Sequence, residues 1–276
     1  MIAFLGMGLL GSNFVRALRR RNLDVQVWSR DAAKAKALAA DGAIPCADPA
    51  AAARGASRVH LTLVDDAAVD DVLARCKLER GAVVVDHSTT SAAGAAARVA
   101  AWRDRGVTYV HAPVFMGPQN ARESTGIMLV SGAPDVLAEL APELAPMTGK
   151  LLQLGDKPDT AAAFKLMGNA FLMCFTAGIA DMLAIGKQLG VPAAAAAQLF
   201  DSFNPGTSVG ARAKRMVDGN FHDASWELAM ARKDARLMIE TGAALALIPA
   251  IAKRMDDVIA QGHAHDDWTV IAKDAR

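Results

Sequence analysis

The sequence predicts an α/β fold in which a doubly wound parallel sheet, residues 1–158, precedes an all-helical domain, residues 159–276. Three observations predict this fold. Short apolar segments rich in β-branched residues alternate with helical patterns, as in parallel βαβ units with right-handed crossovers. A glycine-rich stretch joins the first strand to the first helix. From Asp159 onward the strand patterns disappear and only helical patterns remain.

The junction between the first strand and the first helix has the pattern G-x-G-x-x-G. An apolar run from Ile2 to Leu5 precedes it, and Phe14, Val15 and Leu18 follow at helical spacing. In such a junction the first glycine permits a tight turn, the second lets the backbone approach phosphates, and the third lets the helix pack on the strand. The helix N-terminus adds unpaired N–H groups and a partial positive charge. The pattern predicts a Rossmann domain whose diphosphate-binding residues are Gly6, Met7, Gly8, Leu9, Leu10 and Gly11.

The second strand, Val25 to Trp28, ends at a serine and an arginine. In dinucleotide folds the tip of this strand faces the adenosine ribose. An acidic residue there would repel a 2′-phosphate, whereas Ser29 and Arg30 offer hydrogen-bond donors to one. Asp31 is better suited to cap the next helix, Ala32 to Ala40. We therefore expect NADP(H) rather than NAD(H), which remains the alternative if Arg30 is only a surface arginine.

Later strands place further loops at the same edge of the sheet. They are expected at Val59–Val64, Gly81–Asp86, Val107–Val110, Ile127–Ser131 and Lys150–Leu154. Ligands bind beyond the carboxyl ends of such strands. Chemistry is therefore expected in the loops after Val64, Asp86 and Val114, with Val64, Asp65 and Thr89 as cofactor contacts.

Side chains in these loops also have simpler interpretations. The Thr89 hydroxyl suits a contact with nicotinamide or ribose, and a serine–threonine cluster is also a common helix cap. His87 and His111 follow strands and either serve as a base or pack in the fold.

A long helix is expected to begin the second domain and to lie between the two domains. Asp159 or Thr160 caps it, and Gly190 closes it after Leu189. The helix is apolar on most faces, so it should be buried on several sides, and this predicts a homodimer. Further helices are expected at Pro192–Phe203, Trp226–Glu240 and Pro249–Ala260.

Composition excludes several classes of protein and partner. Hydrophobic residues make up 53% of the 276 residues, which argues against disorder, and a net charge of +1 gives no reason to expect nucleic acid or an anionic membrane. The longest apolar stretch, Ala170 to Ala180, is expected to be too short to span a bilayer. Residues 1–15 lack the pattern of a signal peptide. Three widely spaced cysteines show no metal or disulfide pattern and favour a cytoplasmic location.

Two polar residues interrupt the apolar pattern of the long helix. Lys165 and Asn169 are four residues apart and share one face. Burial would lower the pKa of the lysine and suit it to general acid–base chemistry. The alternative is a lysine whose tip reaches water. Lys233 and Asp234, on the later helix, form an ordinary pair of adjacent charges by themselves.

Four motifs together resemble those of the β-hydroxyacid dehydrogenases, the family of the 3-hydroxyisobutyrate, tartronate semialdehyde and 6-phosphogluconate dehydrogenases or reductases. The resemblance covers nearly the whole chain. The motifs are Gly6-Met-Gly8-Leu-Leu-Gly11-Ser-Asn13, Asp86-His-Ser88-Thr89, Lys165-Leu-Met-Gly168-Asn169 and a C-terminal stretch ending in Lys233-Asp234.

The resemblance implies a role for each matching residue. Lys165 would be the acid–base residue, and Asn169 would hold the substrate near it. Thr89 and Lys233 would line the cleft for cofactor and substrate. An arginine after the second strand marks NADP(H) users in this family, in agreement with Arg30. The long helix usually forms part of a dimer interface.

The substrate loop departs from the family pattern. That loop normally reads Asp-Ala-Pro-Val-Ser-Gly-Gly, and its serine and glycines bind a substrate carboxylate. Here it reads His111-Ala-Pro-Val114-Phe115-Met116-Gly117-Pro118. Phe115 replaces the serine and Met116 the first glycine, so a hydrogen-bonding group is lost from the carboxylate site. We expect Phe115, Met116 and Gly117 to line the substrate site and to favour a bulkier or more apolar substrate.

The sequence therefore predicts an NADPH-dependent oxidoreductase that transfers hydride between nicotinamide and a carbonyl or hydroxy compound. An imine reductase of the same architecture is the first alternative. Many imine reductases replace the catalytic lysine, so Lys165 favours carbonyl chemistry. A non-catalytic nucleotide-binding protein is the second alternative, favoured by Phe115 and Met116 and opposed by Lys165 and Asn169. No metal is expected.

Overall fold

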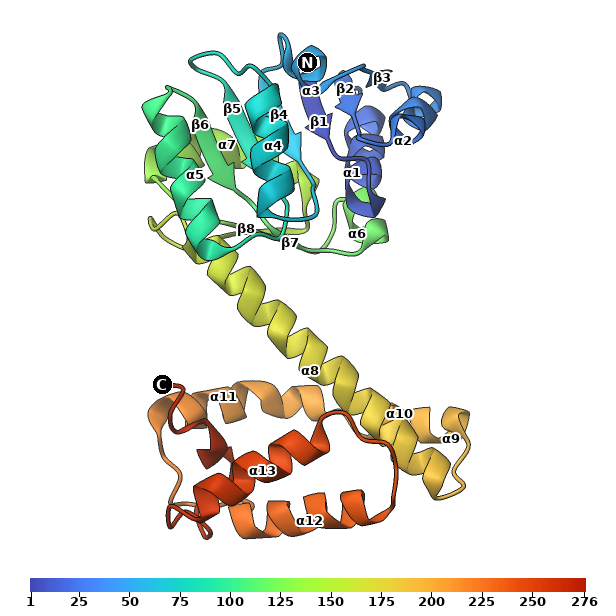
Figure 1. Ribbon diagram of the computed structural model, residues 1–276, viewed down its shortest axis with the longest axis vertical. Coiled ribbons are helices and arrows are strands. Elements are labelled where there is room, and N and C mark those ends of the chain that lie inside the picture. The colour runs from blue at the N-terminus through green and yellow to red at the C-terminus, as the bar shows by residue number, and fades with distance from the viewer. The chain divides into compact units, whose positions relative to one another are not determined.

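The computed structural model describes residues 1–276, and the chain divides into two compact units, Met1–Asn169 and Ala170–Arg276 (Figure 1). This division falls inside the long helix, whereas the sequence places the domain boundary at the start of that helix. Lys165 and Asn169 therefore belong to the first unit together with the sheet.

A six-stranded, all-parallel sheet forms the centre of the first unit, in the order β3-β2-β1-β4-β5-β6. This is the strand order of a doubly wound dinucleotide fold. The strands are β1 Ile2–Leu5, β2 Val25–Trp28, β3 Ile44–Pro45, β4 Arg58–Leu61, β5 Val83–Asp86 and β6 Thr108–His111. The predicted fold class is confirmed, and β4 ends at Leu61 rather than at Val64.

Alternating side chains of the strands build one core on each face of the sheet. Ile2 and Phe4 lie in one core and Ala3 and Leu5 in the other. Helices α1 Leu9–Arg20, α2 Ala32–Ala37 and α7 Pro134–Leu144 cover the first core. Helices α3 Pro49–Ala53, α4 Asp66–Arg75 and α5 Ala92–Asp104 cover the second, and Figure 1 shows α4 and α5 across that face.

A second, three-stranded sheet departs from the purely parallel pattern that the sequence predicts. Its order is β7-β8-β9, with β7 Val114–Phe115, β8 Ile127–Val130 and β9 Lys150–Gln153. β7 runs antiparallel to β8 because the chain reverses through α6, Pro118–Glu123, and Gly126 at a φ of +80°. This reversal places Phe115 opposite Ile127.

Helix α8, Thr160–Gln188, has the extent that the sequence predicts but is more exposed than predicted. Asp181 lies within this helix, and its buried carboxylate accepts three backbone N–H groups, those of Ala246, Leu247 and Ile248, at 2.6–2.9 Å. By length and composition alone α8 could cross a membrane, with a mean hydropathy of 1.5 over 18 residues. The stretch Ala170–Ala180 alone stays shorter than the 18-residue window that meets this criterion.

The single chain does not bury α8, whose burial the sequence analysis ties to a dimer. Only 6% of the same 18-residue window is buried. Phe171 and Met173 are 56% and 70% exposed, so the apolar faces of the helix have no cover from the rest of this chain.

The second unit is helical, as predicted. After α8 come α9 Ala193–Ala197, α10 Leu199–Ser202, α11 Val209–Asp218, α12 Leu228–Glu240 and α13 Ile248–Ile259. Its core lies between α12, α13 and a final 3₁₀ turn, Trp268–Ala272. Buried Asp267 accepts hydrogen bonds from Arg215, Ser225 and Thr269, which ties the turn to the segments before α12.

Candidate functional site

The glycine-rich junction is built by backbone packing that excludes side chains. Gly6 has a φ of +97°, and a Cβ there would lie 2.2 Å from the Thr62 carbonyl oxygen. A Cβ on Gly11 would lie 2.0 Å from the Gly6 carbonyl oxygen, which also accepts a 2.7 Å hydrogen bond from the Thr62 hydroxyl. By contrast, no atom lies within 4 Å of a Cβ built on Gly8. The close approach at Gly6 and Gly11 therefore leaves the Gly8 backbone open to a ligand.

The N-terminus of α1 offers unpaired donors at the same place. No side chain caps this helix. The first of its N–H groups with a backbone partner is that of Ser12, which donates to Gly8 O. The preceding N–H groups and the helix dipole form an anion site of the kind that binds diphosphates.

A cavity of about 220 Å³ extends from the glycines to the tip of β2. It brings together six of the predicted cofactor residues: Gly6, Met7, Gly8, Ser29, Arg30 and Val64. Larger cavities of about 460 and 440 Å³ lie beside Lys77–Ala82 and Gly106–Val110, near the amino ends of the strands. We assign the ligand site to the smaller cavity because it alone contains the glycine junction and lies at the carboxyl edge of the sheet.

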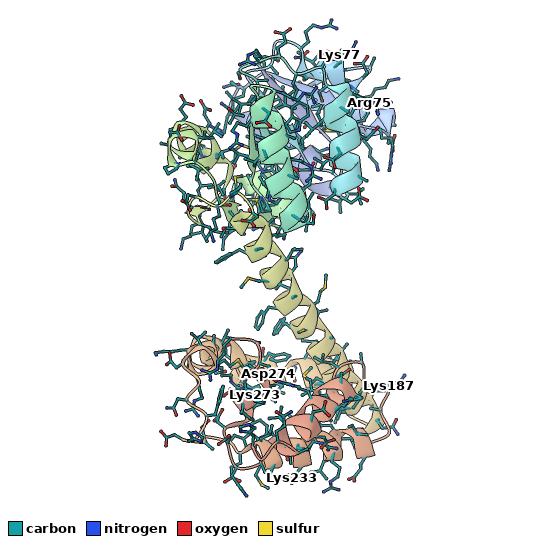
Figure 2. The ribbon with its side chains drawn as sticks, turned by 60° about the vertical axis from the view of Figure 1, so that its left-hand side comes forward. Arg75, Lys77, Lys187, Lys233, Lys273 and Asp274 are labelled. Carbon is teal, nitrogen blue, oxygen red and sulfur yellow. The ribbon has the colours of Figure 1, made fainter.

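The electrostatics of this cavity suit a phosphorylated ribose. Ser29 is buried and Arg30 is exposed at the tip of β2. Two cations that the sequence analysis did not single out, Lys34 and Arg75, line the same cavity. Arg75, at the end of α4 in Figure 2, lies 5.2 Å from the ring of Trp28. The residues present fit a dinucleotide, with the diphosphate at Gly8 and the ribose at Ser29.

Five predicted cofactor residues have side chains that pack on the core, are exposed or form a helix cap. The Met7 side chain is buried in the core, and Leu10 packs against the same core. Leu9 and Val64 are 77% and 75% exposed. Asp65 caps α4, since its carboxylate accepts from the Ala68 N–H at 2.8 Å.

The loop after β5 is held rigidly and exposes Thr89. Asp86 accepts from the Ser88 N–H at 2.8 Å and from the Tyr109 hydroxyl at 2.6 Å. The Ser88 hydroxyl accepts from the Leu63 N–H at 2.9 Å, which links this loop to the loop after β4. Thr89, the residue after Ser88, is exposed, and a contact with the cofactor is predicted for it.

His87 and His111 are packed inside the fold. His87 contacts the His60 ring nitrogen at 3.0 Å and the Ala112 carbonyl oxygen at 2.8 Å. Burial lowers the pKa of His87 to about 4 and lowers that of His111. Both imidazoles are 3% exposed or less, so the packing interpretation holds for them.

Lys165 and Asn169 form the centre of the candidate catalytic site. Lys165 is 9% exposed, and its Nζ donates a 3.0 Å hydrogen bond to the Asn169 amide oxygen. Burial lowers the pKa of Lys165. The predicted shared face is therefore present within the first turns of α8, and burial shifts the pKa of the lysine in the direction that favours proton transfer.

Phe115 and Met116 point in opposite directions, as neighbouring residues of an extended segment do. The Phe115 ring lies 4.4 Å from Lys165 Nζ. Met116 packs against the core and lies beside Gly126. The Gly117 N–H donates to the Asn120 side chain at 2.9 Å and begins α6. Sequence reasoning found Phe115 as a departure from the family but missed its contact with the lysine.

Lys233 lies on α12 in the second unit, where Figure 2 labels it. Its Nζ lies 2.7 Å from the Asp234 carboxylate, and about half of the side chain is exposed. Its contact with the cofactor stays a prediction.

The fold and the glycine junction define a dinucleotide-binding protein of the Rossmann class. Residues 1–155 match the model of the NAD-binding domain of 6-phosphogluconate dehydrogenase. The chain belongs to this family, that of 6-phosphogluconate dehydrogenase and the β-hydroxyacid dehydrogenases.

Three proteins illustrate the range of the relatives. 2-(Hydroxymethyl)glutarate dehydrogenase of Eubacterium barkeri is 25% identical over 87% of this chain and 82% of its own. 3-Sulfolactaldehyde reductase of Escherichia coli is 24% identical over 100% and 95%. The structure of an imine reductase from Myxococcus stipitatus in complex with NADP⁺ superposes with a TM-score of 0.93 at 19% identity, over the whole of both chains. That last likeness shows a common fold.

The comparisons confirm the predicted family and the predicted class of enzyme. The chain is an NAD(P)-dependent oxidoreductase, related to dehydrogenases and reductases along nearly its whole length.

Replacing Gly8 with alanine separates ligand binding from folding. The new methyl group meets no protein atom within 4 Å, and the backbone φ of −75° suits any residue. We expect the free energy of unfolding to change by less than about 0.5 kcal/mol in urea titrations. The Kd for NADPH should rise by about tenfold or more in fluorescence titrations, because the methyl group blocks the approach of the diphosphate.

Two further variants are the controls. Gly11→Ala forces a methyl group against Gly6 and should cost about 1–3 kcal/mol of stability. Gly210→Ala, on α11, also meets nothing within 4 Å and should leave NADPH binding unchanged. If Gly8→Ala binds NADPH with wild-type affinity, the diphosphate does not bind at this junction.

Proposed function

We propose that the protein reduces a carbonyl compound with an apolar substituent, using NADPH as hydride donor and Lys165 as proton donor. The observation that carries this proposal is the buried Lys165, hydrogen-bonded to Asn169 and flanked by the Phe115 ring. In the opposite direction the same site would oxidise the alcohol.

The cofactor preference rests on the tip of β2. Arg30 follows that strand, and Lys34 and Arg75 line the same cavity, where Lys34 lies 3.7 Å from Asp31 and Arg75 lies 3.2 Å from Asp71. Three cations therefore lie near the expected 2′-phosphate position, and Arg30 is the one without an acidic partner. An acidic side chain occurs there in Asp31, whose carboxylate caps α2 by accepting from the Ala33 N–H at 3.1 Å. The Asp31 carboxylate is thus engaged in capping α2 and not in accepting from a ribose 2′-hydroxyl, which is the contact that would favour NAD(H).

The proton transfer follows from the position and the pKa of Lys165. The bound dinucleotide supplies the hydride that reaches the carbonyl carbon. Lys165 Nζ donates a proton to the carbonyl oxygen as the C=O π bond breaks, and an alcohol and a neutral amine result. Burial favours the neutral amine, so it lowers the cost of giving up the proton. The Asn169 amide oxygen holds Nζ in place and accepts no proton.

The substrate class follows from the apolar wall. Where the family places a serine, Phe115 offers a ring that cannot donate a hydrogen bond to a carboxylate. A substrate with an alkyl or aryl group beside the carbonyl would contact this ring and lose no hydrogen bond there. A panel of ketones, aldehydes, hydroxy acids and cyclic imines with NADPH, followed by absorbance, decides between carbonyl and imine reduction.

We also propose that two copies pair through α8. Apolar side chains exposed along this helix, among them Phe171, Leu172 and Phe175, exceed what a chain surrounded by water leaves uncovered. A second copy of the chain would cover these side chains. No lipid would then be needed around α8, although the helix is long enough to cross a membrane. The three cysteines are free in this fold, in keeping with a cytoplasmic location, which cell fractionation would test.

Lys165→Ala should abolish proton donation while NADPH still binds. Turnover of the best carbonyl substrate should fall by about 10²–10⁴-fold, the usual contribution of a general acid. The Kd for NADPH, measured by fluorescence, should change by less than about twofold. Lys157→Ala, on an exposed lysine just before α8, is the matched control and should retain wild-type turnover. Undiminished turnover in Lys165→Ala would refute the assignment.

Arg30→Ala should weaken NADPH and spare NADH. Loss of one charge-assisted contact to the 2′-phosphate should raise the Kd for NADPH about tenfold, and the Kd for NADH should stay within about twofold. Arg21→Ala, just after α1, serves as the control for a general change in charge. Equal effects on both cofactors would show that Arg30 does not read the 2′-phosphate.

Phe171→Glu should separate the two copies. A charge in the middle of the apolar face of α8 opposes its burial in an interface. Sedimentation velocity without detergent should show a dimer for the wild-type protein and for Lys36→Glu, and a monomer for Phe171→Glu. A wild-type monomer at micromolar concentration contradicts the pairing.

A further inference from the structure

The Phe115 ring is seated on the turn of α8 that carries the catalytic lysine. Its centroid lies 4.4 Å from Lys165 Nζ. Its Cζ lies 2.3 Å from the position that a Cβ on Gly168 would take. The ring therefore fills the space that is left because residue 168 has no side chain, and the Lys165 ammonium lies over the ring.

Lys165 Nζ is held from a second side by the Asn169 amide oxygen at 3.0 Å. Burial lowers the pKa of Lys165, and Nζ has no carboxylate within 4 Å, its hydrogen-bond partner being the Asn169 amide oxygen. The two neutral groups around Nζ are thus the amide oxygen and the aromatic ring. Both attract the charged form of the lysine, the ring through its quadrupole.

The backbone that presents Phe115 is fixed by its strand partner. Phe115 is paired with Ile127 in the antiparallel ladder of β7 and β8. The Phe115 carbonyl oxygen lies 2.8 Å from a Cβ position on Gly126, where a φ of +80° favours glycine. The backbone that carries the ring is therefore held in place by the pairing of β7 with β8 and by the close packing at Gly126.

We propose that Phe115 is a positioning residue for Lys165, an aromatic platform that holds the ammonium in place against the Asn169 amide oxygen. This inference rests on the proposed function insofar as Lys165 is the proton donor. In this arrangement one ring does two things: it fixes Nζ, and it takes the place of the hydrogen-bonding serine at the substrate. The platform accounts for a site that keeps the family's lysine and lacks the family's carboxylate binder.

The pKa of Lys165 tests the platform without any substrate. We would label the full-length protein with carbon-13 lysine and titrate it by NMR, assigning the Lys165 resonance from its loss in Lys165→Arg. Phe115→Leu keeps an apolar side chain and removes the quadrupole. It should lower the pKa of Lys165 by about one unit.

Gly168→Ala is the second variant, since it pushes the ring away and leaves Phe115 itself intact. It should lower the pKa of Lys165 in the same direction as Phe115→Leu.

Circular dichroism checks that each variant is folded. An unchanged or raised pKa in folded Phe115→Leu would overturn the platform, as would an unchanged pKa in folded Gly168→Ala.

Kinetics distinguish this inference from the proposed function. With an active carbonyl substrate, Phe115→Leu should lower kcat by more than it changes KM. In the reduction direction the rate falls as Lys165 loses its proton, so this fall should move to lower pH in Phe115→Leu by the shift seen in NMR. Full turnover in Lys165→Ala would end the proton-donor role and leave the NMR result standing. A missing NMR shift would end the platform and leave Lys165 as proton donor.

Discussion

Close backbone packing between β1, α1 and β4 determines where a ligand can bind in the first unit. Gly6 and Gly11 approach each other and Thr62 so closely that neither position admits a Cβ. This packing brings the N-terminus of α1 to the carboxyl edge of the sheet, where its first N–H groups stay free. The tip of β2 and the loop after β4 end at the same edge, so one contact between backbones brings together the predicted diphosphate position, the predicted ribose position and the cations Arg30, Lys34 and Arg75.

The sequence predicts the fold where a segment carries its own periodicity or its own cap. β1, β2 and α1 were predictable because apolar alternation and the glycine pattern are local. β3 escaped because it has two residues, one of them Pro45. Helix α5 escaped because its apolar residues are mostly alanines, which define no face, and few of its side chains, Trp102 and Val99 among them, reach the core. The burial of α8 stays a prediction, since an apolar pattern shows that a helix needs a partner and the single chain does not supply one.

In the candidate site, too, contacts within one element were predictable from the sequence and contacts between elements were not. Lys165 and Asn169 could be paired from a spacing of four residues because both lie on one helix. The contact between Phe115 and Lys165 joins β7 to α8, and no local pattern encodes it. Lys34 and Arg75 were overlooked for the same reason, because each looks like a surface cation until the cavity brings it beside Trp28 and Arg30. For His87 the sequence left a base and a packing residue open, and the structure shows that both of its ring nitrogens have partners inside the fold.

Gly168 and Phe115 cannot be altered independently of each other. Any side chain at residue 168 would collide with the ring, and any small residue at 115 would leave a void beside the lysine. A substitution at residue 115 that widens the proposed substrate site therefore also opens space beside Lys165, and a larger residue at 168 requires a smaller one at 115. The shape of the site and the placement of its lysine are coupled through this one pair of residues.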